Sequence, residues 1–164
     1  MDAALEQNFV SLLKQNQNIV HKICRLYTTN DEEHNDLFQE IAIQLWKAFP
    51  KFRNESKFST WAYRVALNTA ITLYRKSTKE IKTNTFESER VWVKQEEYNF
   101  EEEEQLALLY KAVQQLNDID KALVFLYLED KDYQEIADTM GITEVNARVK
   151  MNRIKGKLKK IVNP

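Results

Sequence analysis

The sequence predicts an all-α protein of two small helical domains joined by a flexible acidic linker, with a helix-turn-helix in the second domain. Only two glycines and two prolines interrupt the 164 residues, which favours long helices over a turn-rich β architecture. Apolar residues recur at intervals of three and four through most of the chain, the spacing of amphipathic helices. The charges are also distributed unevenly, which divides the chain into parts.

Two basic blocks flank an acidic stretch. Residues 47–76 carry seven Lys or Arg against one Glu, and residues 141–164 carry seven against one. Residues 77–104 carry nine Glu and four Lys or Arg with weak periodicity, which predicts a flexible linker between domains 1–76 and 105–164. The net charge of −1 alone argues against nucleic acid, but two basic patches indicate two DNA contacts.

Three helices are predicted in the first domain. The first covers residues 5–27, with Phe9, Val20 and Ile23 in its apolar stripe, and the polar run 28–35 ends it. The second begins near Asp36 and stops at Pro50. A short basic loop then leads into the third helix, residues 57–76.

The helix over residues 57–76 has two faces of different chemistry. One side carries small and aromatic packing residues such as Tyr63, Ala66 and Leu67. The opposite side carries Trp61, Arg64, Asn68, Thr72 and Arg75. An indole beside two guanidinium groups and two uncharged hydrogen-bonding side chains is suited to stacking on bases and holding phosphates.

Four helices are predicted in the second domain, starting near Gln105. The short third one begins at Asp132, which forms a capping-box pattern with Glu135. Gly141 makes a turn, and Thr143 caps a longer basic helix. A short helix, a glycine turn and a basic helix predict a helix-turn-helix.

The outer side of that last helix carries Val145, Arg148, Val149, Asn152 and Arg153. Arginine reaches guanine edges or phosphates, asparagine pairs with adenine or a phosphate, and Val149 suits a thymine methyl group. Lys150 flanks this surface as a phosphate contact, which positions the protein without reading sequence.

Each of these features also has a plainer interpretation. Trp61 is alternatively a core residue, and Val145 and Val149 alternatively pack on the preceding helix. The acidic run 101–104 is a solvated start of the next helix, or else it folds back over a basic surface.

Other classes of function find little support. No apolar run approaches the ~18 residues of a membrane span, and no secretory signal stands at the start. The single cysteine, Cys24, excludes an internal disulfide and fits a reducing cytoplasm. His21 and Cys24 are three residues apart, but two ligands do not make a zinc site. With no phosphate loop, ligand cluster or nucleophile–base pattern, we expect neither an enzyme nor a bound metal or cofactor.

Two motifs carry a resemblance to a known family. DLFQEI at residues 36–41, Trp46 and FSTWAYRVALNTA at residues 58–70 resemble the second conserved region of bacterial sigma factors. Residues 116–158 resemble their fourth region. Because the chain has no room for a third region and no acidic first region, it resembles the extracytoplasmic-function (ECF) group.

The resemblance implies three sets of binding residues. Core RNA polymerase would be bound by Asp36, Leu37, Gln39, Glu40 and Ile43. The −10 promoter element would be bound by Lys51, Arg53, Lys57, Trp61, Arg64, Asn68, Thr72 and Arg75. The −35 element would be bound by Thr143, Asn146, Arg148, Val149, Lys150, Asn152 and Arg153.

The resemblance also implies partners and leaves one alternative. Such proteins act in the cytoplasm, without cofactors, on core RNA polymerase and promoter DNA, and an anti-sigma factor, often membrane-anchored, commonly holds them inactive. Many relatives carry an acidic residue at the position of Thr72, and often a serine and a bulky group at Val149 and Asn152, so no promoter consensus is predicted. The alternative is a stand-alone helix-turn-helix regulator, which explains residues 105–164 but not residues 36–75.

Overall fold

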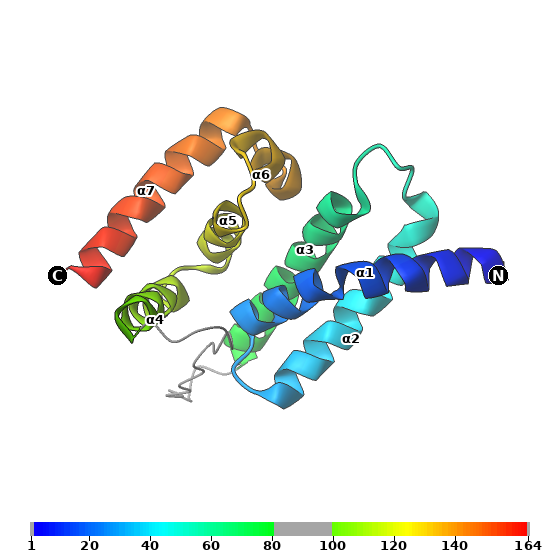
Figure 1. The fold of residues 1–164 in the computed structure, drawn as a ribbon, viewed down its shortest axis with the longest axis horizontal. Helices are drawn as coiled ribbons and strands as arrows, with labels where there is room; N and C mark the ends of the chain where they lie inside the picture. Colours follow the sequence, from blue (N-terminus) through cyan, green and yellow to red (C-terminus); the bar gives the residue numbers. More distant parts are fainter. Residues whose placement is uncertain (1, 81–99, 164) are drawn as a thin grey trace. The chain divides into compact units, whose positions relative to one another are not determined.

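The computed structural model describes residues 2–80 and 100–163, with side chains for 2–73, 104–105 and 107–163. Every regular element within those ranges is helical, which confirms the predicted all-α fold. The chain divides into two compact units, Met1–Phe86 (unit 1) and Glu87–Pro164 (unit 2), each with its own helices (Figure 1).

Residues 2–80 of unit 1 form a bundle of three α-helices. Its elements are α1 (Ala3–Tyr27), α2 (Asp31–Ala48), the short 3-10 helix η1 (Phe49–Lys51) and α3 (Phe58–Glu80). Helix α3 packs against both α1 and α2. The apolar stripes of the three helices meet in a fully buried core that includes Ile23, Ile41 and Leu67. Burying these stripes is the main favourable contribution to the stability of the bundle.

Helix α2 begins five residues before the predicted position near Asp36. The side chain of Asn30 accepts a hydrogen bond of 2.8 Å from the backbone N–H of Glu33, and the Glu33 carboxylate accepts one of 3.0 Å from the N–H of Thr29. This reciprocal capping, with acidic residues in the first turn, starts a helix inside the polar run. The prediction was wrong here because it took a capping sequence for a break.

The helices also extend into both ends of the predicted linker. Helix α3 continues to Glu80 and helix α4 starts at Phe100, so residues 77–80 and 100–104 are helical. Neither segment contains a glycine or proline to end a helix. The remainder of the predicted linker, residues 81–99, lies outside the described residues.

The described residues of unit 2, 100–163, form four helices, with the longest packed on the other three. They are α4 (Phe100–Gln114), α5 (Asp118–Leu128), α6 (Tyr133–Met140) and α7 (Glu144–Val162). Helix α7 contacts α4, α5 and α6 through a stripe that includes the buried Ala147, Met151 and Ile154. The opposite side of α7 is therefore left at the surface.

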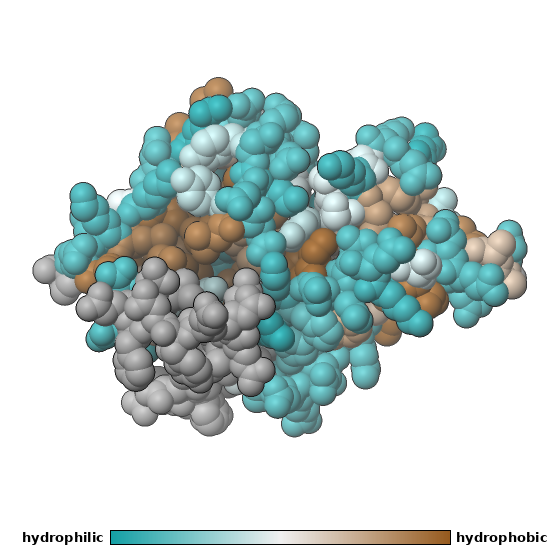
Figure 2. Space-filling model, viewed as in Figure 1, coloured by the Kyte–Doolittle hydropathy of each residue, from teal (hydrophilic) through white to brown (hydrophobic). Residues whose placement is uncertain are grey.

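Hydrophilic side chains cover most of the face seen in Figure 2, and apolar ones are visible in smaller groups between them. In unit 2 such a group lies beside α4, α5 and α7 (Figures 1 and 2). Within the described residues, no helix is both long enough and apolar enough to cross a membrane.

Candidate nucleic-acid interface

Helix α3 presents a polar face opposite its buried stripe. Tyr63 and Leu67 are 4% and 1% exposed and pack inward, whereas Arg64, Asn68 and Thr72 are exposed. The Thr72 hydroxyl donates a 2.8 Å hydrogen bond to the backbone carbonyl of Asn68. The division of α3 into two faces is thus observed, although the side chain of Arg75 lies outside the described set.

Trp61, at the start of this face, belongs to an aromatic cluster with Phe49, Phe52 and Phe58. Its ring centroid lies 4.9 Å from that of Phe52 and 5.4 Å from that of Phe58, in tilted arrangements. Trp61 is partly buried. Trp61 is therefore neither a fully buried core residue nor a fully exposed one, because the indole packs on the bundle and also reaches the surface.

The basic loop before α3 is held beside Trp61. Phe52 and Phe58 stand near its two ends, and their ring centroids are 5.9 Å apart in an edge-to-face contact. Between them the backbone passes through a left-handed residue, Asn54, with φ of 56°. Asparagine tolerates this conformation better than most residues. The aromatic contacts therefore anchor the loop that carries Lys51, Arg53 and Lys57, all of which are exposed.

Helix α2 carries four of the five residues expected to bind the polymerase on one outer side. Asp36, Gln39 and Ile43 are exposed, and Ile43 is 47% accessible despite its apolar side chain. Glu40 is half-buried and accepts a 2.9 Å hydrogen bond from the side chain of Gln44. These residues follow the three- and four-residue spacing of one helix face, the α2 outer face. Leu37 differs, because it is only 7% exposed and packs inside unit 1.

Two histidines join α1 to the first turn of α2. His21 Nδ1 and His34 Nε2 are 2.9 Å apart, so one ring donates an N–H to the other. Phe38 stacks on His21 with a centroid distance of 4.6 Å. Burial, aided by the positive charge of Arg25, lowers the pKa of His21 below its usual value. The neutral form of His21 therefore fits the folded unit best.

The helix-turn-helix of unit 2 is built from the predicted caps. The Asp132 carboxylate accepts a 2.8 Å hydrogen bond from the N–H of Glu135, and the Thr143 hydroxyl accepts one of 3.1 Å from the N–H of Asn146. Gly141 ends α6 with φ of 69°, a left-handed conformation that glycine adopts without steric penalty. These local contacts fix where α7 begins relative to α6.

The outer side of α7 forms a recognition face of exposed Asn146, Arg148, Val149, Asn152 and Arg153. Val145 and Val149 are 72% and 42% exposed, so neither is buried against the preceding helix. Lys150 is half-buried at its edge. An apolar contact, an amide and two guanidinium groups on one exposed helix can form base and phosphate contacts in a major groove.

Three of the cations of α7 have specific neighbours. Arg148 Nη2 lies 2.8 Å from Glu144 Oε1, and the Arg148 guanidinium also stands 4.6 Å from the centre of the Tyr133 ring. Lys155 lies over the Tyr127 ring at 4.5 Å. Lys157 pairs at 3.3 Å with Asp120, which is largely buried. The basic helix is thus partly neutralised and partly stacked.

Sequence reasoning missed these neighbours for different reasons. Glu144 and Arg148 are four residues apart, the spacing at which oppositely charged side chains pair on a helix, so the sequence does contain a signal for this contact. Two other contacts join different helices: Arg148 with Tyr133, and His21 with His34. Residue spacing within one helix does not predict such contacts. Within the described ranges, no group of three His, Cys, Asp or Glu side chains could hold a metal ion.

Comparison with known proteins agrees with this architecture. Residues 12–80 match the Sigma-70 region 2 family, and residues 106–158 match Sigma-70, region 4. The region 2 match covers the segment that a stand-alone regulator leaves unexplained, and it therefore favours the sigma interpretation.

Named relatives span most of the chain. The RNA polymerase sigma-H factor of Pseudomonas aeruginosa is 27% identical over 164 residues, covering 93% of this chain and 84% of the relative. The ECF RNA polymerase sigma-E factor of Haemophilus influenzae is 25% identical, covering 95% and 88%.

Solved structures share the fold at low sequence identity. The sigma factor RpoE of Bartonella quintana, in complex with the anti-sigma factor NepR, has a TM-score of 0.68 at 14% identity and covers 98% of both chains. CnrH in complex with the cytosolic domain of CnrY has a TM-score of 0.67 at 16% identity, covering 96% and 89%.

Region 2 followed by region 4 of the sigma-70 family defines a sigma factor, a class of transcription initiation factor. Its relatives include several factors named for the ECF group. The chain belongs to the ECF group of sigma factors, and the resemblance read from its motifs is confirmed.

Proposed function

We propose that this chain directs core RNA polymerase to promoters by dividing the work between two parts. Residues 1–76 bind the core enzyme and the −10 element, and residues 105–164 bind the −35 element. The observation that carries the proposal is the presence, in one sigma-family chain, of a Trp-Arg-Asn face on α3 and a capped recognition helix, α7.

The α2 outer face is the proposed polymerase-binding surface. Asp36, Gln39 and Glu40 supply polar contacts and Ile43 an exposed apolar one, while Leu37 supports them from the core. An exposed isoleucine beside carboxylates and amides suits an interface in which an apolar centre is surrounded by polar groups.

The α3 face and its basic loop are the proposed site for the −10 element. Lys51, Arg53 and Lys57 would hold phosphates, while Trp61, Arg64 and Asn68 contact bases as the strand opens. Thr72 and Arg75 continue the same helix face. Binding the opened strand more tightly than the duplex would favour opening, since a ligand shifts an equilibrium toward the state it prefers.

The α7 recognition face is the proposed site for the −35 element. Arg148, Val149, Asn152 and Arg153 would read bases, while Thr143, Asn146 and Lys150 contact the sugar–phosphate backbone. The protein performs no bond chemistry in this scheme, needs no cofactor and acts in the cytoplasm. Its contribution to initiation is binding free energy.

An anti-sigma factor is the proposed negative regulator. One solved neighbour is the sigma factor RpoE in complex with the anti-sigma factor NepR, and another is CnrH in complex with the cytosolic domain of CnrY. Such a partner would cover polymerase-binding surfaces of this chain, so competition with core enzyme is the expected behaviour.

Transcription from genomic fragments tests the whole proposal. Core enzyme with this protein should start transcripts at discrete sites that core enzyme alone does not use. The proposal fails if the purified protein does not co-migrate with core enzyme and no promoter-specific transcript appears.

A matched pair of substitutions tests the α2 outer face. Ile43→Asp should weaken binding to core enzyme by about tenfold or more, because it places a charge in an apolar contact. Val10→Asp is the control, since Val10 is an apolar residue of α1 with similar exposure, 41% against 47%. Equal losses in the two variants would assign the effect to general surface charge instead.

A further inference from the structure

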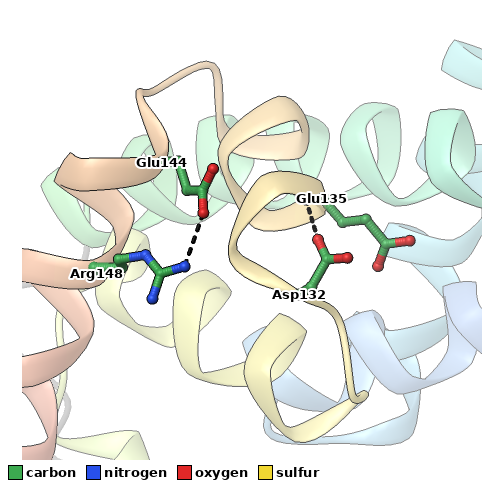
Figure 3. A network of polar contacts seen from close by, with 4 residues as sticks. All are labelled: Asp132, Glu135, Glu144 and Arg148. Atoms are coloured by element: carbon green, nitrogen blue, oxygen red, sulfur yellow. Dashed lines mark hydrogen bonds and ion pairs between the residues drawn. The ribbon is translucent and has the colours of Figure 1, made fainter.

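Arg148 is held by two neighbours from different helices. Its guanidinium is 2.8 Å from the Glu144 carboxylate on α7 and 4.6 Å from the Tyr133 ring centre on α6. Figure 3 shows the Glu144 carboxylate directed at Arg148. The side chains of Arg148 and Glu144 are 57% and 41% exposed, and an exposed ion pair alone restricts a side chain weakly. The ring contact adds a second restraint through cation–π attraction.

The two neighbours occupy equivalent places in the helix-turn-helix. Tyr133 directly follows the N-cap residue Asp132, and Glu144 directly follows the N-cap residue Thr143. The backbone positions of both are fixed by cap hydrogen bonds of 2.8 and 3.1 Å. Helix starts defined in this way give Arg148 a rigid frame on both sides.

We propose that Glu144 and Tyr133 are positioning residues that direct the Arg148 guanidinium at one base pair of the upstream element, and so set the base preference there. The inference rests on the proposed function, because it assumes that α7 reads the −35 element.

The physical reason lies in the planar shape of the guanidinium group. Its N–H groups form a rigid fork, and one part of that fork is engaged by Glu144 while a face is covered by Tyr133. The remaining N–H groups therefore point in a restricted direction before DNA arrives. A side chain ordered in advance loses less conformational entropy on binding.

Glu144 also contributes to selectivity through its negative charge. A carboxylate at the start of the recognition helix repels phosphates and the acceptor-rich edge of guanine. Only a DNA arrangement that places Arg148 between Glu144 and these groups avoids the repulsion. Removing this charge should strengthen binding to DNA in general while reducing discrimination between bases.

The experiment uses full-length protein bound to core enzyme and a promoter duplex library randomised in its upstream element. Glu144→Gln should lower the ratio of affinities for the preferred base and the other bases at one position by about tenfold. This is the discrimination expected of a well-placed arginine. The variant's binding to the pooled library should not weaken. Tyr133→Leu should flatten the same position, and Tyr133→Phe, which keeps the ring, should retain the preference.

Glu135→Gln is the matched control. It removes the same charge from α6, and Figure 3 shows the Glu135 side chain pointing away from Arg148. This variant should keep the wild-type base preference at every position. Thermal unfolding of each variant identifies any loss that comes from the fold of unit 2.

A double substitution separates positioning from direct reading. Arg148→Ala should flatten the same position, and adding Glu144→Gln should change the base preference no further. The inference is overturned if Glu144→Gln keeps the wild-type preference, or if it still alters preference when Arg148 is absent, since Glu144 would then read a base itself. If the wild-type protein with core enzyme selects no upstream sequence, the proposed function fails as well.

Discussion

Trp61 rests on Phe52 and Phe58, and this packing determines how its role is measured. Removing the indole leaves a gap beside both rings, so Trp61→Ala affects stability as well as any contact with bases. A simple loss of activity in this variant therefore has two possible physical causes.

We expect Trp61→Ala to weaken promoter opening more than binding to closed duplex. The reason is that stacking on an exposed base is available only after the strands separate. Opening is measured with a fluorescent base in the −10 element, and closed binding at low temperature. Phe52→Leu is the control, because it loosens the packing of the same aromatic cluster but keeps the indole of Trp61. Equal losses of opening and closed binding in Trp61→Ala would contradict the role.

Cys24 is expected to be an unreactive thiol in the folded protein. It is fully buried in α1, and burial raises its pKa to about 12, so the reactive thiolate is scarce at pH 8. Labelling by a thiol reagent should be at least about a hundredfold slower than in urea, because it requires opening of unit 1. Rapid stoichiometric labelling of the native protein would show that the α1 core opens readily.

At the scale of single elements, replacing each of the two glycines with alanine should change the stability of unit 2 in opposite directions. Gly141 ends α6 in a left-handed conformation, whereas Gly156 lies inside α7, where an added Cβ would meet no atom within 4 Å. Gly141→Ala should lower the free energy of unfolding of unit 2 by about 1–2 kcal/mol. Gly156→Ala should raise it by about 0.5–1 kcal/mol through helix propensity.

Urea unfolding of the two variants measures both effects. Gly156→Ala also serves as the control for adding a methyl group to unit 2. Destabilisation by both substitutions to the same extent would mean that backbone conformation is not the cause.

Prediction from sequence succeeded for elements with local signals. The apolar stripe of α3, the caps at Asp132 and Thr143 and the turn at Gly141 depend on residues a few positions apart. It failed at the start of α2, where Asn30 and Glu33 cap a helix within a polar run. The aromatic packing of Trp61 and the ring beside Arg148 depend on contacts between elements, which local patterns do not contain.

At the scale of the whole molecule, unit 1 should lose more stability than unit 2 when the pH falls from neutral to 5.5. Both histidines of the chain lie in unit 1, bonded to each other at 2.9 Å. Burial and Arg25 lower the pKa of His21 in the folded state, so between that value and the unfolded value of about 6.5 the unfolded chain binds more protons. The stability that neutral His21 contributes is present above about pH 6.5 and is lost as the pH falls below it.

Hydrogen exchange of the full chain at pH 7.5 and 5.5, corrected for intrinsic rates, checks this expectation. Protection of α1 and α2 should fall at pH 5.5 by more than that of α5 and α7. His21→Gln should reduce the difference, because it removes the group whose pKa is lowered in the folded state. An equal loss of protection in both units would point to carboxylates rather than to the histidine pair.

The contact between Tyr133 and Arg148 also bears on how promoter preference could be exchanged between sigma factors. Because the ring belongs to α6 and the guanidinium to α7, a graft of α7 alone would separate the arginine from one of its two supports. The smallest transferable segment is then the helix pair from Asp132 to Val162, with its turn and both caps. A chimaera that carries only α7 of the donor should keep the donor's charge-dependent affinity for DNA but lose its selectivity between base sequences.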